Sequence, residues 1–328
     1  MTGASGFLGR SIVERLRADG YRVRGLVRAG RILPWTDVET AHGDLADGAA
    51  IEAAVKDMEF VVHAGARVET TGKWEEFAEA NIRGTKRVIR AAVAAGVKRI
   101  VHISSLSVYD VPRDGVTITE DSSYERETSA RGHYSRSKLA ADRLALWEAD
   151  RGAPVIVLRP GLLYGPGKRP PVARQSFTRA GFKLLLARPR YRMPYSYVEN
   201  VADAVALSLQ APGAIGKAFT LVDENVTQAE LVAAYRAASR EAWRPLYLPV
   251  GLIAAAAWFV ERTFGLARRR SPITYHQIRR STDSAWYDCS RAEQILGWHP
   301  RVDLKEGLRR AFDALSPAAP GLAVGVAS

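Results

Sequence analysis

The chain begins MTGASGFLGR, and the glycine spacing of this stretch limits what the fold can be. Gly3, Gly6 and Gly9 stand three residues apart, directly before a stretch that reads as a helix. In a dinucleotide-binding turn, one glycine makes the tight turn, one lets the backbone approach a pyrophosphate, and one lets helix pack on strand. The N–H groups of that helix would point at the phosphates. Alone the motif is a weak signal, because small residues also form ordinary turns.

The first half of the chain alternates short apolar runs with helical stretches. Strands are expected at 21–27, 60–64, 97–104 and 154–158, and helices at 11–19, 74–95 and 133–149. This alternation is typical of βαβ units around a parallel sheet. We therefore predict an α/β fold, a doubly wound parallel Rossmann sheet with a smaller C-terminal substrate lobe.

No strand precedes the glycine turn, since only Met1 stands before Thr2. The strand leading into such a turn lies in the middle of the sheet, and its loss leaves two neighbouring strands without a partner. The first strand is thus apparently truncated. We hypothesise that the true chain begins several residues earlier with an apolar strand. The alternatives are a gapped sheet, or a slot filled by another segment.

Tyr134 and Lys138 stand four residues apart at the start of the expected helix 133–149, and so share one face of it. A tyrosine has an ordinary pKa near ~10 and is a poor proton donor or acceptor at neutral pH. A cation one turn away favours the phenolate and is expected to lower that pKa. Ser104 and Ser105 end the expected strand 97–104, where ligands of parallel sheets bind. A hydroxyl there can polarise a carbonyl or alcohol beside the tyrosine.

Further motifs follow in order along the chain. They are Gly43-Asp44-Leu45, VVHAGA at 61–66, NIRGT at 81–85, GVKRIVHISSLSVYD at 96–110, LRPGLLYGPG at 158–167, YVENVADA at 197–204 and DCSRAEQILGWHP at 288–300. With TGASGFLG and YSRSK, they make the chain resemble the extended short-chain dehydrogenase/reductase family of NAD-dependent epimerases and dehydratases. The resemblance is to its branch of 3β-hydroxysteroid dehydrogenases and dihydroflavonol reductases.

The resemblance implies a role for each matching residue. Tyr134 would be the general acid/base, Lys138 its activator and a ribose ligand, and Ser105 the hydroxyl that polarises the substrate. Asp44 and Leu45 would touch the adenine, and Asn81 would support the cofactor. The full cofactor-binding set is Gly3, Ser5, Gly6, Phe7, Leu8, Gly9, Arg28, Asp44, Leu45, Ala64, Gly65, Ala66, Asn81, Ser104, Tyr134, Lys138 and Pro160.

The end of the second strand bears on the choice between NADP and NAD. An acidic residue there binds the ribose 2′-hydroxyl, whereas an arginine accommodates a 2′-phosphate. The chain has Arg28 and no acid between 25 and 31, which favours NADP. The alternative is that Arg28 stacks on the adenine and NAD binds.

The sequence is compatible with three alternative functions, which differ in substrate and reaction. In nucleotide-sugar members of the family an asparagine commonly follows the strand arginine, but here Arg159 is followed by Pro160, as in the reductase and hydroxysteroid branches. We expect hydride transfer at a secondary alcohol or ketone of a lipophilic substrate. The alternatives are a nucleotide-sugar epimerase and a non-catalytic dinucleotide-binding sensor or assembly factor.

The domain boundaries follow from where the alternation ends. Residues 1–164 are expected to form the NAD(P)-binding Rossmann domain, with 195–222 returning to it. Residues 165–194 and 223–312 are expected to form the substrate-binding lobe. The tail 313–328 has too little apolar surface to bury and is expected to be disordered.

Charge and cysteine content narrow the classes of partner. The 328 residues carry a formal net charge of +12, but the arginine clusters at 188–192 and 268–270 lie in no recognisable nucleic-acid module. The single cysteine excludes an internal disulfide, and the six histidines show no ligand spacing, so no metal site is expected. The family resemblance suggests a homodimer through the helix that carries Tyr134.

The longest apolar run is LPVGLIAAAAWFV at 248–260, followed by an arginine triplet at 268–270. It is shorter than the roughly 20 residues needed to span a bilayer. It is expected to be a buried helix, a helix lining a lipophilic pocket, or one that lies on a membrane through 248–270. No apolar leader opens the sequence. We expect a cytoplasmic protein, with membrane association as the open question.

Overall fold

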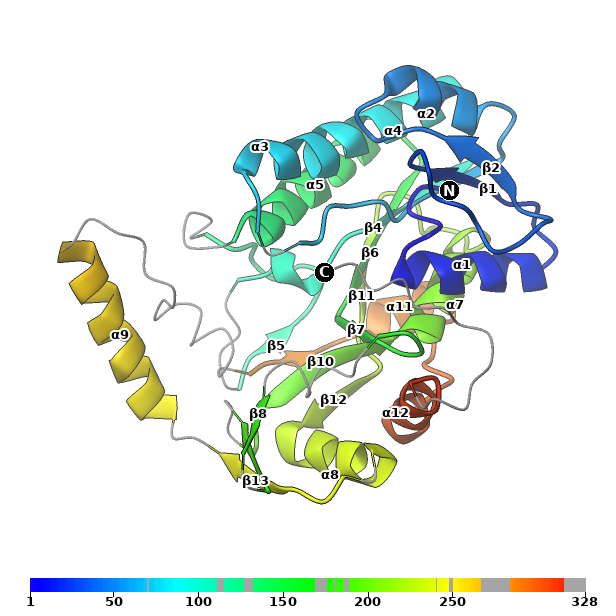
Figure 1. Cartoon of the computed structure of the whole chain (residues 1–328). Helices are drawn as coiled ribbons and strands as arrows, with labels where there is room; N and C mark the ends of the chain where they lie inside the picture. The colour runs from blue at the N-terminus through cyan, green and yellow to red at the C-terminus, as the bar shows by residue number, and fades with distance from the viewer. Residues whose placement is uncertain are drawn as a thin grey trace.

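The computed structural model describes residues 1–69, 71–110, 115–126, 132–168, 176–179, 181–185, 189–239, 241–247, 250–266 and 284–315. Its centre is a parallel sheet with helices on both faces (Figure 1). The strands are β1 (Arg24–Val27), β2 (Glu39–His42), β3 (Phe60–His63), β4 (Arg99–Ile103), β6 (Val155–Pro160) and β11 (Ala218–Leu221). They lie in the order β2, β1, β3, β4, β6, β11, and every neighbouring pair that forms a ladder is parallel. The predicted α/β doubly wound fold is confirmed.

Met1 and Thr2 occupy the gap between β1 and β3. Thr2 forms parallel bridges to both Leu26 and His63, and its N–H donates to the Val62 carbonyl at 3.0 Å. The Leu26 N–H donates to the carbonyl of Met1 at 2.8 Å, and the Met1 ammonium donates to the Arg24 carbonyl at 2.6 Å. These two residues therefore join the two halves of the sheet immediately before the glycine turn.

Two helix layers bury the two faces of the sheet. On one face lie α1 (Phe7–Ala18) and α7 (Val198–Ser208), which pack against each other. On the other lie α2 (Gly48–Val55), α4 (Gly84–Ala94) and α5 (His133–Ala149). The short α3 (Trp74–Phe77) is continuous with α4 through a π-helical segment at Ala78–Arg83. The helix expected over 74–95 is thus one helix with a wider turn in its middle.

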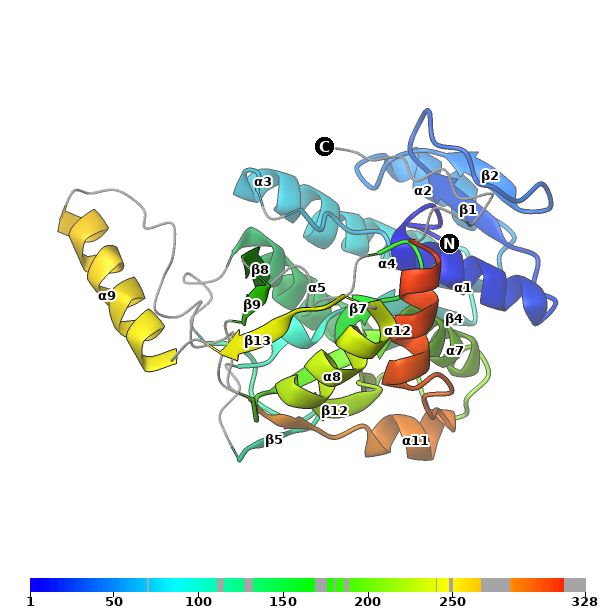
Figure 2. The same ribbon diagram turned by 60° about the horizontal axis from the view of Figure 1, so that its bottom comes forward.

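The C-terminal half adds smaller sheets below the carboxyl ends of the central strands (Figure 2). One of these sheets consists of β7 (Leu162–Tyr164), β10 (Arg192–Tyr197) and β12 (Glu224–Thr227). A second consists of β8 (Ser176–Arg179), β9 (Phe182–Leu185) and β13 (Arg244–Tyr247). A third is the pair of β5 (Thr117–Ile118) and β14 (Trp286–Tyr287). Within the described residues, the remaining helices are the 3₁₀ turn Leu106–Val108, α8 (Gln228–Ser239), α9 (Val250–Leu266), α11 (Ser290–Leu296) and α12 (Leu304–Asp313).

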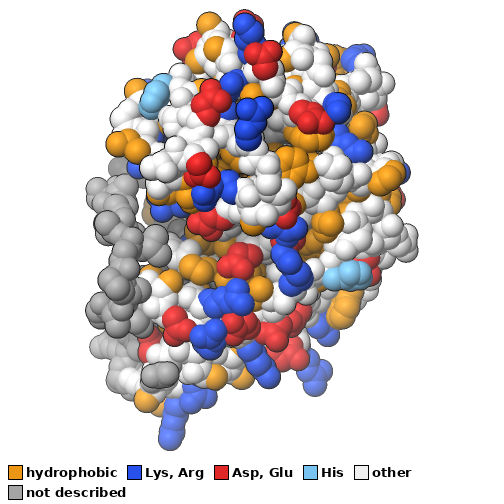
Figure 3. Space-filling model, turned by 90° about the vertical axis from the view of Figure 1, so that its right-hand side faces the viewer, with side chains coloured by type: hydrophobic (Ala, Val, Ile, Leu, Met, Phe, Trp, Pro, Cys, Tyr) orange, Lys and Arg blue, Asp and Glu red, His pale blue; other side chains and the backbone are white. Residues whose placement is uncertain are grey.

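Some sequence expectations fall at the limits of the described chain. α12 ends at Asp313, within the stretch assigned to the tail, and residues 316–328 lie outside the described residues. The arginine triplet 268–270 also lies outside them. On the face shown in Figure 3, acidic and basic side chains lie interspersed, so the positive net charge is not concentrated there.

Gly9 tests the close packing of α1 on the glycine turn. A Cβ built on Gly9 would lie 1.9 Å from the Gly3 carbonyl oxygen, so Gly9→Ala must push α1 away from the turn. Overpacking of this kind costs about 1–3 kcal/mol, and we expect a lower midpoint of thermal unfolding. The control is Gly48→Ala at the start of α2, where nothing lies within 4 Å and alanine is the better helix former. Equal midpoints for the two variants would contradict this account of α1.

Candidate active site

The glycine turn opens onto a cavity through the amino end of α1. Gly3 has φ +71°, and a side chain there would also meet the backbone of Ala64 and Gly65. α1 begins after Gly6, and no side chain of the described residues caps it or places an acid in its first turn. The first N–H groups of α1 are therefore left for a ligand, and the helix dipole favours an anionic one.

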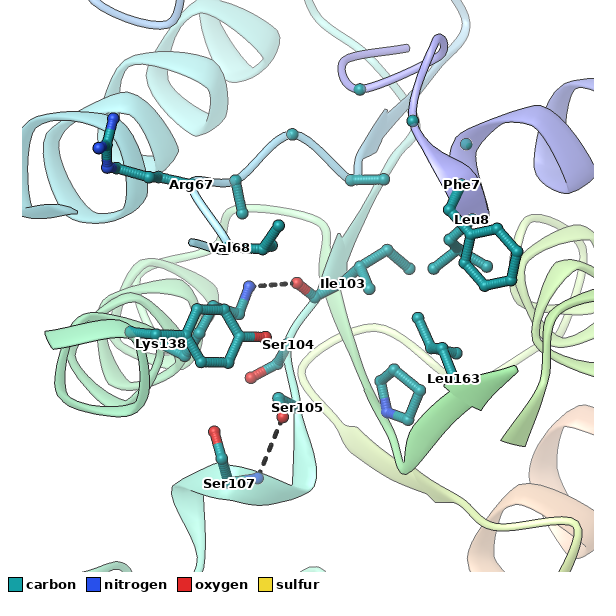
Figure 4. A pocket seen from close by; sticks show the side chains of 18 of the residues that line it. Phe7, Leu8, Arg67, Val68, Ile103, Ser104, Ser105, Ser107, Lys138 and Leu163 are labelled. Carbon is teal, nitrogen blue, oxygen red and sulfur yellow. Dashed lines mark hydrogen bonds between the residues drawn. The ribbon is translucent and has the colours of Figure 1, made fainter. Parts of the chain in front are cut away.

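This cavity has a volume of about 1090 Å³ and lies at the carboxyl ends of the central strands. Every residue predicted for catalysis or cofactor binding except Asn81 lines it: Gly3, Ser5, Gly6, Phe7, Leu8, Gly9, Arg28, Asp44, Leu45, Ala64, Gly65, Ala66, Ser104, Ser105, Tyr134, Lys138 and Pro160. Figure 4 shows Phe7 and Leu8 on one side of the space and Lys138, Ser104 and Ser105 on the other. The predicted site residues thus converge on one cavity.

Asn81 lies behind the cavity wall, within the π-helical segment. Its Oδ1 accepts the Arg67 N–H at 2.7 Å, and its Nδ2 donates to the Arg67 carbonyl at 3.0 Å and to Ser137 Oγ at 2.9 Å. Asn81 is buried, so these bonds tie the segment after β3 to α5. The wider turn places the Asn81 side chain at a position that a regular α-helix would not give it. Such π-helical turns are common at functional sites.

His63 holds the glycine turn against the sheet. Its Nδ1 lies 2.7 Å from Thr2 Oγ1 and its Nε2 lies 2.9 Å from Thr85 Oγ1. Thr2 Oγ1 also accepts the Gly65 N–H at 3.0 Å. Burial, with the nearby charge of Lys138, lowers the pKa of His63 to about 3, so the ring is neutral and serves as a fixed hydrogen-bonding link.

The two serines at the end of β4 have different surroundings. The Ser104 hydroxyl is buried and donates to Asp142 Oδ1. The Ser105 hydroxyl accepts the Ser107 N–H at 3.1 Å (Figure 4), and it acts to lower the pKa of the Tyr134 phenol. Of the two serines, Ser105 is therefore the one whose hydroxyl influences the tyrosine.

The Tyr134 pKa differs from the sequence expectation. Burial raises the pKa of the Tyr134 phenol above its ordinary value, and the Ser105 hydroxyl only partly opposes this. The Lys138 Nζ donates to the Ile103 carbonyl at 2.6 Å. Burial lowers the pKa of Lys138 to about 8, although the Asp142 carboxylate acts in the other direction. At neutral pH the phenol is therefore protonated and the lysine carries its charge.

A buried ion pair fixes this half of the site. Arg159 and Asp142 are 1% and 0% exposed, and Arg159 Nη2 lies 2.7 Å from Asp142 Oδ2. Asp142 also accepts from Ser104 and Tyr124, and Arg159 donates to Tyr109 Oη at 2.8 Å. Burial lowers the pKa of Arg159, but the Asp142 carboxylate outweighs it and the net pKa is raised. The pair links α5, β4 and β6 beneath the catalytic groups.

The opposite end of the cavity has the residues expected for an adenosine. Arg28 follows β1 and is exposed, while Asp44 and Leu45 follow β2. Asp44 Oδ1 accepts the Ala46 N–H at 3.0 Å, which holds the turn in place. The cradle formed by the close glycines, the uncapped helix and this basic end fits a dinucleotide that runs from Arg28 to Pro160.

Sequence reasoning did not name most of the remaining wall. It combines apolar side chains with charged and polar ones. The apolar members include Val68, Leu106, Leu162, Leu163, Met193, Pro194, Ala285 and Tyr287, and the charged and polar members include Arg67, Glu69, Glu76, Glu79, Ser107, Lys168, Arg192 and Ser284. Leu162 and Leu163 lie inside the motif at 158–167. Met193 and Pro194 lie on β10, which is placed beside the cavity because its Tyr195 pairs with Leu162 of β7. Tyr287 arrives through β14, which pairs with β5. Only the tertiary structure brings these residues together.

Three proteins illustrate what the chain is similar to. A 2-alkyl-3-oxoalkanoate reductase of Stenotrophomonas maltophilia is 30% identical, over 94% of this chain and 97% of its own. Sterol demethylase protein B of Methylococcus capsulatus is 29% identical over 92% and 93%. The solved structure of MoeE5 in complex with UDP-glucuronic acid and NAD is 27% identical with a TM-score of 0.72, covering 96% and 97% of the two chains.

The family match covers the part of the chain that builds the cavity. The model of the NAD dependent epimerase/dehydratase family matches residues 1–221, which include the glycine turn, Ser105, Tyr134 and Lys138. That stretch is more than half of the 328 residues. The chain therefore belongs to the NAD dependent epimerase/dehydratase family, as an NAD(P)-dependent enzyme of the oxidoreductase or epimerase type.

Proposed function

We propose that the protein is an NAD(P)-dependent reductase that transfers hydride to a ketone of a lipophilic substrate, with Tyr134 as acid/base. The observation that carries the proposal is that Ser105, Tyr134 and Lys138 line one cavity at the carboxyl end of β4, and that the glycine turn opens onto the same cavity. The reverse reaction oxidises the corresponding secondary alcohol.

The protonation states support reduction at neutral pH. The bound dinucleotide supplies the hydride to the ketone carbon, and the carbonyl oxygen then needs a proton. Tyr134 holds that proton because burial raises its pKa, and Ser105 can donate a hydrogen bond to the same oxygen. The charged Lys138 is one turn away and would offset the phenolate that remains. Solvent returns a proton to Tyr134 after the step.

The cavity wall supports a lipophilic substrate. Besides the residues assigned to catalysis and the cofactor, the wall includes the apolar side chains Leu106, Leu162, Met193, Pro194 and Tyr287, together with charged ones such as Arg192 and Lys168. The apolar part of such a wall binds hydrocarbon because it removes apolar surface from water. The names of two relatives fit this chemistry, since a 2-alkyl-3-oxoalkanoate carries a ketone between alkyl chains and a sterol is a hydrocarbon ring system.

A nucleotide-sugar epimerase is the second candidate, because MoeE5 is a relative solved with a UDP-sugar. An epimerase returns the hydride to the substrate it came from, so it causes no net change in nicotinamide absorbance. A reductase consumes one reduced nicotinamide for each ketone. Assays with long-chain 3-oxo compounds, sterol ketones and UDP-sugars, followed by absorbance and by product analysis, separate these two and also a protein that binds the dinucleotide without turnover.

Replacing Tyr134 with phenylalanine removes the proposed proton donor and little else. We expect kcat for ketone reduction to fall by about 10²–10⁴-fold, with the dissociation constant for reduced nicotinamide and the unfolding midpoint unchanged. Tyr21→Phe is the matched control, because Tyr21 lies outside the cavity and its hydroxyl accepts a surface hydrogen bond from Gln210. Full activity of Tyr134→Phe would rule out the mechanism.

The pH dependence follows from the same two groups. Lys138, with a pKa of about 8, is charged below that pH and neutral above it. We expect kcat/KM for reduction to fall as pH rises through about 8, and alcohol oxidation to increase at higher pH as Tyr134 loses its proton. Lys138→Arg keeps the cation over this range, so any activity it retains should lack the fall near 8. A wild-type profile that is flat from pH 6 to 10 would contradict the assignment.

Preference for NADPH over NADH is proposed to rest on Arg28. Arg28→Glu replaces a cation suited to a 2′-phosphate with a carboxylate suited to two hydroxyls. We expect the ratio of kcat/KM for NADPH to that for NADH to fall at least about tenfold, which is roughly 1.4 kcal/mol. Arg31→Glu makes the same charge change three residues away, outside the cavity lining, and should leave the ratio unchanged. Equal effects of the two substitutions would mean that Arg28 does not bind the phosphate.

A further inference from the structure

α9 stands clear of the rest of the described chain. Figures 1 and 2, which differ by a 60° turn, both show it beside the small β8–β9–β13 sheet rather than packed on the central layers. Its two adjacent aromatic side chains, Trp258 and Phe259, are 52% and 64% exposed. Side chains of this size are costly to leave in water, so a surface that displays them side by side calls for a partner.

Four of the exposed residues of α9 lie on one side of the helix. At about 100° per residue, these are Ala255, Trp258, Phe259 and Arg262. Glu261, Thr263 and Phe264 are also exposed at other positions around the helix, whereas Ala257 is buried. The Arg262 guanidinium lies 5.5 Å from the centre of the Trp258 ring. The outward face therefore combines an apolar surface with a cation at the level of the aromatic rings.

The small sheet that precedes α9 also has exposed apolar side chains. Phe182 on β9 and Leu246 on β13 are 44% and 47% exposed. In the parallel register Leu246 lies opposite Leu184, which is two residues from Phe182, so both side chains point to the same face of the small sheet. We name Phe182, Leu246, Trp258 and Phe259 the α9 surface.

Charge and length indicate the kind of partner. Residues 250–270 contain four arginines (262, 268, 269 and 270) and one glutamate, within a chain of net charge +12. Among the described residues no helix is long and apolar enough to span a membrane. A helix with aromatic side chains and arginines, too short to span, lies in the head-group region of a bilayer, where anionic lipids attract the cations.

We propose that the α9 surface docks onto anionic lipid bilayers, with Trp258 and Phe259 in the interface and Arg262 at the phosphates. The inference is independent of the proposed reaction, because it concerns a surface away from Tyr134. A second copy of the chain is the competing occupant, and the experiment below separates the two.

The test uses the full chain and vesicles of phosphatidylcholine alone or with 30% phosphatidylglycerol, separated by sedimentation. We expect binding to the anionic vesicles, weakened at 0.5 M salt, and little binding to the neutral ones. Trp258→Ser with Phe259→Ser should lower the partition coefficient at least tenfold, with unchanged unfolding midpoint and nicotinamide binding. Replacing Arg268, Arg269 and Arg270 by glutamine should reduce binding to the anionic vesicles.

The matched control is Trp147→Ser with Ile215→Ser, two side chains of similar exposure, 44% and 45%, away from α9. This control should bind vesicles like the wild type. No binding to anionic vesicles, equal binding to both compositions, or equal losses in the two double variants would overturn the proposal. So would a dimer, measured by light scattering, that Trp258→Ser with Phe259→Ser converts to a monomer while vesicle binding is absent.

Discussion

The ion pair between Arg159 and Asp142 connects the three elements that carry the catalytic groups. Removing both charges from water costs several kcal/mol per ion, and about that much must be recovered by direct contacts. Hydrogen bonds to both ions offset this desolvation cost. Asp142 accepts from Arg159, Ser104 and Tyr124, and Arg159 also donates to Tyr109. A pair this completely bonded permits few other arrangements of α5 against β4 and β6. The positions of Ser105, Tyr134 and Lys138 depend on it.

Beside the same ion pair, the two neighbouring serines, Ser104 and Ser105, have different hydrogen-bond partners. Asp142 accepts the hydroxyl of Ser104, whereas the hydroxyl of Ser105 acts to lower the pKa of Tyr134. Asp142 also lies one turn beyond Lys138 on α5, and its charge keeps the pKa of the buried lysine from falling further than about 8. The ion pair thus sets both the geometry and the charge of the site, although none of its own atoms needs to touch a substrate.

The sequence predicted the parts of the site that are local in the chain. The glycine turn, the end of β4 and the Tyr134–Lys138 pair each lie within one element, so spacing alone places them at the cavity. The direction in which the pKa of Tyr134 shifts could not be predicted in this way, because it depends on burial of the phenol in the folded chain. The π turn at Asn81 was missed for a related reason: residues 74–95 have an ordinary helical pattern, and the extra residue is held by contacts to Arg67 and Ser137.

The walls of the cavity come from more of the chain than the groups assigned to the chemistry. Those groups lie within residues 1–221, the stretch that matches the family model. Leu162, Met193 and Pro194 also lie within that stretch, whereas Ala285 and Tyr287 reach the cavity from beyond it. A reductase and an epimerase can use the same groups for the chemistry, since both protonate and deprotonate one oxygen. They differ in whether the ketone can turn its other face to the hydride, and the walls of the cavity bear on that difference.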